Sequence, residues 1–297
     1  MADRAVELSD WRSVNDALRR KELRQALYDE EDAAAGVPKA VAAARRLRRI
    51  NSLVQIEEHV MDVNADTVED LIRGADVVLD GSDNFEVRYL LNEACVKQGM
   101  PWIYGGVLGT YGLTAAILPG ETPCLRCLLG PMPPPASVPT CETAGVLGPM
   151  VAVIASLEVT EALKILIGRR EDLLRSLLMI DVWTGDFERA QTQAPAADCP
   201  VCGQGRYELL EAEGGSVATM LCGRNAVQIR PRPAPVLDLA VLADRLADVG
   251  RVEVNEYLLR LVTEGKELTI FGDGRAIVKG VDDEAQARAL YARYVGS

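Results

Sequence analysis

The pattern of apolar and polar positions divides the chain into two parts of different character. In the first part, helical and extended periodicities alternate. Helices are expected at 37–50, 66–73, 86–99 and 148–168, and strands at 54–60, 75–80, 100–105, 113–118 and 177–182. Alternation of strand and helix is typical of parallel strands that are covered on both faces. We therefore predict an α/β fold with a mostly parallel, doubly covered sheet.

From residue 206 onward the pattern changes. A helix at 237–249 is followed by strands near 252–262, 267–271 and 276–279 and by a final helix at 283–294. This order predicts a small α+β domain with an antiparallel sheet. We expect two domains, an α/β domain over residues 1–205 and an α+β domain over residues 206–297.

Charge and hydropathy exclude several classes of partner. The net charge of -12 over 297 residues gives no basic field that would attract a nucleic acid. The N-terminus has no apolar signal region, and the weakly polar stretch from Ala144 to Leu157 is too short and too rich in glycine to span a bilayer. We expect a cytoplasmic protein that acts on a small molecule or a protein, with neither a nucleic acid nor a membrane as partner.

Four of the seven cysteines form two C-x-x-C pairs, Cys124 with Cys127 and Cys199 with Cys202. Cytosolic thiols stay reduced, so metal binding or catalysis is a better explanation for these pairs than a disulfide framework. Each pair has the spacing of a tetrahedral zinc site, and four thiolates leave no coordination position open. We predict one structural Zn²⁺, and the alternative is two unrelated redox or chance motifs.

The segment from Asp80 to Asn84 lies where a predicted buried strand ends and the next helix begins, which is where open α/β sheets bind ligands. Asp83 is a candidate ligand for Mg²⁺, and Asn84 is a candidate for contacting phosphate or ribose. Arg88, one turn into the helix, would reach the same ligand. From local sequence alone, a helix N-cap is an equally good interpretation of Asp83.

Three other residues are candidates for chemistry. Cys141 follows a proline-rich stretch and precedes a predicted helix, whose dipole would stabilise a nucleophilic thiolate; the alternative is a buried, inert thiol. Arg24 and Lys39 are candidates for contacting phosphate, although isolated cations are usually solvated surface charges. The glycine-rich run 105–112 leads into a strand, so we interpret it as a tight backbone approach near a ligand. His59, the sole histidine, is interpreted as structural.

Taken together, these motifs resemble the ThiF/MoeB/HesA family, the bacterial relatives of ubiquitin-activating enzymes. The resemblance covers residues 20–203. The matching pieces, in order, are Arg24-Gln25 with Gly36-Val37-Pro38-Lys39, the Asp80–Arg88 segment with Leu91-Asn92, Pro123–Cys127, Thr140–Pro149 and Cys199–Gly203. Five motifs in one order are far more specific than any one of them.

The resemblance implies a Rossmann-like fold and a defined activity. ATP would adenylate the C-terminal glycine carboxylate of a ubiquitin-like sulfur-carrier protein. The implied roles are phosphate neutralisation by Arg24 and Lys39, positioning of Mg²⁺ by Asp83, a nucleotide site lined by Asn84 and Arg88, a ribose position at Asp3 and a carrier acceptor at Cys141.

One departure from the family concerns the start of the fold. Family members open with a strand, a G-x-G-x-x-G turn and a helix, and no such turn lies upstream of Gly36. We therefore expect an adenylation domain truncated at its N-terminus, with weak or no adenylation by this chain alone. Expected partners are the carrier and either a second copy in a homodimer or a complementing subunit. The alternative is a non-catalytic, zinc-stapled module that binds the carrier or acts as a partner subunit.

Overall fold

The structure, a computed structural model, describes residues 30–134, 139, 144–192, 194–212, 217–221, 226–232, 235–281 and 283–296. Contacts divide the described residues into two compact units. Unit 1 lies within residues 62–212, and unit 2 combines residues 30–61 with those from 217 onward. Each unit is described by itself below. The separation of residues 1–205 from residues 206–297 as folding domains stays a prediction.

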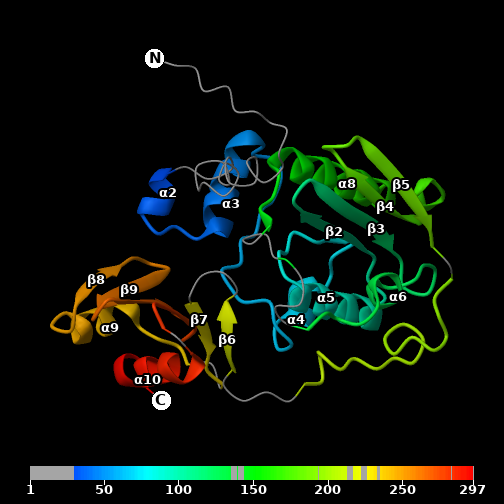
Figure 1. Cartoon of the computed structure of the whole chain (residues 1–297). Coiled ribbons are helices and arrows are strands. Elements are labelled where there is room, and N and C mark those ends of the chain that lie inside the picture. The colour runs from blue at the N-terminus through cyan, green and yellow to red at the C-terminus, as the bar shows by residue number, and fades with distance from the viewer. Residues whose placement is uncertain are drawn as a thin grey trace, which may run out of the picture. The chain divides into compact units, whose positions relative to one another are not determined.

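Unit 1 is built on a five-stranded sheet in the order β1-β2-β3-β4-β5 (Figure 1). The strands are β1 (Val78–Leu79), β2 (Trp102–Leu108), β3 (Tyr111–Ile117), β4 (Ser176–Asp181) and β5 (Asp186–Gln191). The β1 and β2 strands are parallel, whereas the other three neighbouring pairs are antiparallel. The α/β class is confirmed, but the prediction of a mostly parallel sheet is wrong for the described residues.

The connections explain the antiparallel pairs. Gly109 and Thr110 join β2 to β3 directly, and a connection this short forces a hairpin, because parallel neighbours need a long crossover. The expected strand at 54–60 does not form, and its residues have no strand pairing. The β5 strand is exposed along its whole length, so its sequence lacks the apolar alternation that would have predicted it.

Helices cover both faces of this sheet. Three of them, α4 (Val68–Ile72), α5 (Phe85–Gln98) and α6 (Leu125–Leu129), share a core with the side chains of Trp102 and Tyr104 from β2. The long helix α8 (Gly148–Leu166) packs on the opposite face, where Ile103 points, and a short 3-10 helix, η2 (Arg170–Asp172), follows it. Successive residues of β2 thus contribute to different cores, as the pleat of a strand requires.

Helix α8 lies unusually close to the sheet. A Cβ atom on Gly112 would stand 2.6 Å from Cγ1 of Ile154, and one on Gly105 would stand 2.4 Å from Oε1 of Glu158. The glycine-rich run therefore serves a close approach by helix α8. Among the apolar residues of this helix, Ile154 is buried, whereas the side chain of Val151 is exposed.

Unit 2 contains a six-stranded antiparallel sheet in the order β6-β7-β11-β10-β9-β8. Its elements are α2 (Glu30–Ala34), α3 (Lys39–Ile50), β6 (Val217–Leu221), β7 (Ala226–Arg230), α9 (Leu239–Leu246), β8 (Arg251–Val254), β9 (Leu258–Thr263), β10 (Lys266–Phe271), β11 (Ala276–Lys279) and α10 (Glu284–Tyr294). Its core joins the inward face of the sheet to α9 and α10. Asn255 ties in the α2–α3 connection by donating to the carbonyl oxygen of Ala35 at 3.0 Å.

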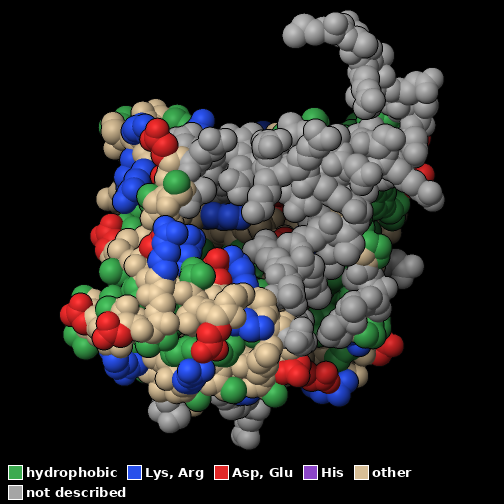
Figure 2. All heavy atoms as spheres, turned by 60° about the vertical axis from the view of Figure 1, so that its left-hand side comes forward, with side chains coloured by type: hydrophobic (Ala, Val, Ile, Leu, Met, Phe, Trp, Pro, Cys, Tyr) green, Lys and Arg blue, Asp and Glu red, His purple; other side chains and the backbone are tan. Residues whose placement is uncertain are grey.

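The outward face of unit 2 is polar. Arg260 pairs with Glu253 and Lys279 pairs with Glu267 across neighbouring strands, and Arg251 pairs with Glu253 along β8. Acidic and basic side chains both lie on the molecular face that Figure 2 shows. Among the described helices, none combines the length and apolarity needed to cross a membrane.

Candidate functional site

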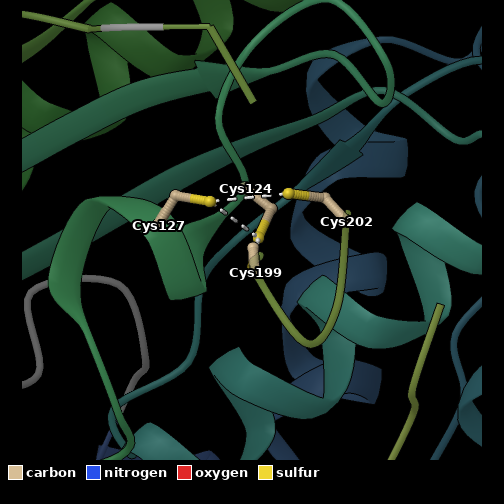
Figure 3. Close-up of side chains that lie close together, drawn as sticks. All are labelled: Cys124, Cys127, Cys199 and Cys202. Carbon is tan, nitrogen blue, oxygen red and sulfur yellow. Dashed lines mark hydrogen bonds between the residues drawn. The ribbon is translucent and has the colours of Figure 1, made fainter. Parts of the chain in front are cut away.

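The four cysteines of the two C-x-x-C pairs converge in unit 1, with their side chains pointing toward one another (Figure 3). All four sulfur atoms lie within 4.8 Å of one another. The Sγ–Sγ distances are 3.9 Å for Cys124–Cys127, 3.7 Å for Cys124–Cys199 and 3.4 Å for Cys127–Cys202. A tetrahedron with Zn–S bonds of about 2.3 Å has edges of about 3.8 Å. The cluster therefore has the dimensions of a four-thiolate metal site.

The first pair is carried by the start of helix α6. Cys124 is the N-cap of this helix, and its carbonyl oxygen accepts hydrogen bonds from the backbone N–H groups of Cys127 and Leu128. The side chain of Asn92, on helix α5, accepts from the N–H of Leu125 at 2.8 Å. Because a free helix N-terminus leaves N–H groups without partners, this bond fixes where the first pair lies.

The second pair is carried by a tight turn. The carbonyl oxygen of Cys199 accepts hydrogen bonds from the N–H groups of Gly203, at 3.0 Å, and Gln204, at 2.9 Å. A Cβ atom on Gly203 would stand 2.4 Å from the carbonyl oxygen of Ala197, so glycine alone fits this position. Helix α5 also holds this segment, since Glu93 accepts from the N–H groups of Leu209 and Leu210 at 2.9 and 3.1 Å.

The electrostatics of the cluster favour a bound cation. Burial, with smaller contributions from the charges of Cys127 and Cys199, raises the pKa of Cys124 to about 11. Burial also raises the pKa of Cys202 well above that of an ordinary thiol. Burial opposes ionisation of Cys199 too, but backbone and thiol hydrogen bonds outweigh it and lower that pKa to about 7. Four thiolates this close together require a positive ion, and soft thiolate ligands suit zinc.

A second constellation lies at the carboxyl end of β1. The buried carboxylate of Asp80 accepts from the N–H and the hydroxyl of Ser82, at 2.8 and 2.6 Å, through Oδ1. Through Oδ2 it accepts from Nε of Arg88 at 3.0 Å, and Nη2 of Arg88 donates to the carbonyl oxygen of Ser82 at 2.7 Å. The loop between β1 and α5 is thus closed by an ion pair and four hydrogen bonds within the chain.

This arrangement places the candidate residues of the loop. Asn84 is the N-cap of α5 and accepts from the N–H of Val87 at 2.8 Å. Asp83 is exposed at the start of the helix, and no hydrogen bond or ion pair engages it within the described part of the chain. Arg88 is buried, and its guanidinium lies 5.7 and 5.8 Å from the ring centres of Phe85 and Tyr104. Its contacts hold the loop.

The remaining candidates are Lys39, Asp3, Arg24 and Cys141. Lys39 begins helix α3 of unit 2. Asp3, Arg24 and Cys141 lie outside the described residues, so their assigned roles stay predictions.

The sequence reasoning missed Glu158. This residue of α8 is buried beside Asp80 and Arg88, and burial, followed by the charge of Asp80, raises its pKa to about 8. No motif marks it, because α8 is apolar around most of its circumference and the buried side is not evident from periodicity. A glutamate four residues after the buried Ile154 was the available signal.

Comparison with known proteins gives a consistent result. The model of the ThiF family matches residues 22–201. A sulfur carrier protein ThiS adenylyltransferase of Bacillus subtilis is 42% identical over 276 residues, which cover 92% of this chain and 81% of the relative. A sulfur carrier protein adenylyltransferase of Thermus thermophilus is 41% identical over 185 residues, which cover 61% of this chain and 67% of the relative.

Solved structures show the same fold. A crystal structure of E. coli MccB with ATP superposes with a TM-score of 0.51 at 21% identity, covering 65% of this chain. The chain spans about half of that protein, since 56% of its length is covered. At this identity the likeness concerns the fold alone.

Proposed function

We propose, because the chain belongs to the ThiF family, that it activates the C-terminal glycine carboxylate of a ubiquitin-like sulfur-carrier protein by adenylation. The names of both relatives support this substrate class. The observation that carries the proposal is the Asp80–Asn84 loop. It lies at the carboxyl end of a strand, leads into the N-terminus of α5 and presents the carboxylate of Asp83, which has no partner among the described residues.

The proposed reaction needs positioning and charge stabilisation more than covalent help from the protein. A carboxylate oxygen of the carrier attacks the α-phosphorus of ATP, the bond to the β-phosphate oxygen breaks, and pyrophosphate leaves. The products are a carrier acyl-adenylate and pyrophosphate. Negative charge develops on the phosphate oxygens during this step, and fixed positive groups lower its barrier.

The residues of the chain take the following parts in this proposal. Asp83 would hold Mg²⁺, which neutralises phosphate charge, because a free carboxylate is a suitable hard ligand. Asn84 caps α5, whose N-terminal N–H groups favour an anion. Arg88 supports the nucleotide site by holding its loop. By resemblance to the family, Arg24 and Lys39 would neutralise phosphate charge and Asp3 would contact the ribose. Cys141 is the proposed acceptor to which the carrier is subsequently transferred.

In the same proposal, Cys124, Cys127, Cys199 and Cys202 hold a structural Zn²⁺. The Sγ–Sγ distances support this assignment. All four ligands come from the protein, so the ion would have no open position for a substrate. It would join two segments that are far apart in the sequence and would take no part in the chemistry.

Pyrophosphate exchange into ATP tests the adenylation step. The probe is the ThiS carrier of Bacillus subtilis, because a relative is named for that protein. We expect exchange that depends on the carrier and on its C-terminal glycine, and a loss of at least about 100-fold in Asp83→Ala. The matched control is Asp76→Ala, an exposed aspartate before β1. Absence of exchange, or equal exchange by Asp83→Ala and wild type, would contradict the proposal. The rate also measures how active this chain is alone.

A further inference from the structure

Three charged side chains are buried together where β1, α5 and α8 meet. Asp80, Arg88 and Glu158 expose 4%, 8% and 6% of their surfaces. Charged groups are rarely this buried unless they are paired. Asp80 and Arg88 pair with each other, at 3.0 Å between Oδ2 and Nε, but Glu158 is a second acid beside a single guanidinium.

The carboxyl group of Glu158 is only partly compensated, by the charge of Arg88 and by a backbone hydrogen bond with Asp80. Its Oε1 atom is buried and has no hydrogen-bond partner among the described residues. It lies against Gly105 of β2, where the missing side chain provides the space that the carboxyl group occupies. A buried polar atom without a partner destabilises the folded state, and an ionised one destabilises it far more. Core packing alone therefore does not explain a carboxyl group at this position.

Titratable and charged side chains from several elements lie around Glu158. Asp80 follows β1 and opposes ionisation of Glu158, whereas Arg88 of α5 favours it. From β2, Tyr104 points its ring toward Arg88, and burial raises the pKa of its hydroxyl to about 12, so it stays neutral. On α8 itself, Glu161 is already engaged by Lys164 and by the N–H of Leu174. Burial, then Asp80, raises the pKa of Glu158 to about 8.

We propose that Glu158 is a positioning residue whose neutral carboxyl group keeps Arg88 committed to Asp80 and thereby fixes the Asp80–Asn84 loop. The inference rests on the proposed function, because this loop carries Asp83. An ionised Glu158 would compete with Asp80 for the guanidinium and would repel the Asp80 carboxylate. Either effect loosens the bond from Arg88 to the carbonyl oxygen of Ser82, which precedes Asp83. The proton on Glu158 thus gates the nucleotide loop.

The variant Glu158→Gln keeps the size of the side chain and removes its titration. We expect pyrophosphate exchange by the wild type to fall as the pH rises through about 8, and exchange by Glu158→Gln to persist, so that the two differ about tenfold one pH unit above that midpoint. The loss should appear in the KM for ATP, because the loop positions the nucleotide. Glu161→Gln, which alters the other buried glutamate of α8, should follow the wild-type profile. Coincident profiles of wild type and Glu158→Gln would overturn the proposal.

A second measurement separates this inference from the proposed function. Hydrogen exchange of the amides of Ser82 and Val87, which are bonded to Asp80 and Asn84, reports on the loop without any catalysis. At alkaline pH these amides should exchange faster in the wild type than in Glu158→Gln. If they do so while no variant catalyses pyrophosphate exchange, the proposed function fails and the positioning role stands. Equal protection in both variants would overturn the positioning role, whatever the activity.

Discussion

The four-cysteine cluster and the Asp80–Arg88–Glu158 cluster bury negative charge in the same unit by different means. Asp80 has Arg88 as an internal counterion, and Glu158 is kept neutral by a proton. The sulfurs of the cysteine cluster face one another, and the charges that act on Cys124 come from other cysteines. The presence or absence of an internal counterion indicates which of the two clusters would depend on a bound ion for its stability. A cluster that contains its own counterion needs no other charge, whereas four ionised thiols would need an ion from solution.

Removal of the metal from the cysteine cluster should have the largest effect. Cys124→Ser should lower the zinc content from one ion per chain to near zero and reduce the free energy of unfolding by about 5 kcal/mol, because a structural ion contributes its binding energy to folding. Metal analysis and urea unfolding check this. Cys95→Ala, at a buried thiol outside the cluster, should keep the ion. The expectation would be contradicted by a wild-type chain that binds no zinc, or by one whose free energy of unfolding does not change when a chelator is added.

The loss of the internal counterion should come next. Asp80→Asn leaves the buried guanidinium of Arg88 without its carboxylate, and we expect a loss of about 4 kcal/mol in urea unfolding. The control is Asp70→Asn, which breaks the exposed pair with Arg73 and should cost less than about 0.5 kcal/mol. Equal stabilities of the two variants would show that the buried pair is not what holds the loop.

The proton on Glu158 should make stability depend on pH. Its pKa is raised from 4.5 to about 8 in the folded chain, so the folded chain holds this proton more tightly than the unfolded chain does. That contribution is complete below about pH 4.5 and is lost as the pH rises to about 8. Relative to the wild type, Glu158→Gln should therefore gain stability across this window, reaching at most about 3 kcal/mol at pH 7. Urea unfolding at several pH values measures the gain, and a constant difference would contradict it.

A backbone contact beside the cysteine cluster should have the smallest effect. Gly203→Ala brings a Cβ atom to 2.4 Å from the carbonyl oxygen of Ala197 and should cost about 1.5 kcal/mol, together with weaker zinc binding. Gly148→Ala, at the start of α8, meets no atom within 4 Å and should change stability by less than about 1 kcal/mol. Thermal unfolding with and without chelator compares the two, and equal effects would show that the turn tolerates a side chain.

The cysteine cluster was predictable from the sequence because its chemistry is local. Each C-x-x-C pair brings two thiols together on one turn, and the chemistry of zinc supplies the reason for two such turns to meet. The helices at Lys39–Ile50, Phe85–Gln98 and Gly148–Leu166 were predicted for a similar reason, since the residues that favour a helix lie within each segment itself.

The direction of the strands and the buried side of α8 were not predictable in this way. The hairpin of β2 and β3 is set by the two residues between the strands, which the sequence reading assigned to a ligand approach. On α8, Val151 and Val159 are exposed while Glu158 is buried. A helix that is apolar on most sides packs where the sheet has room, and Gly105 and Gly112 create that room. Such information lies in a different segment of the chain from the helix that uses it.

Helix α5 gives a rule for building chimeras with relatives. Its first turn is bonded to the Asp80–Asn84 loop through Asn84, and its middle holds the two cysteine segments through the neighbouring residues Asn92 and Glu93. The three attachments lie on one short stretch of the gene. A crossover placed inside that stretch would separate the loop from the segments that hold the four-cysteine cluster. A recombined gene must therefore exchange the helix together with all three attached segments or leave all of them in place.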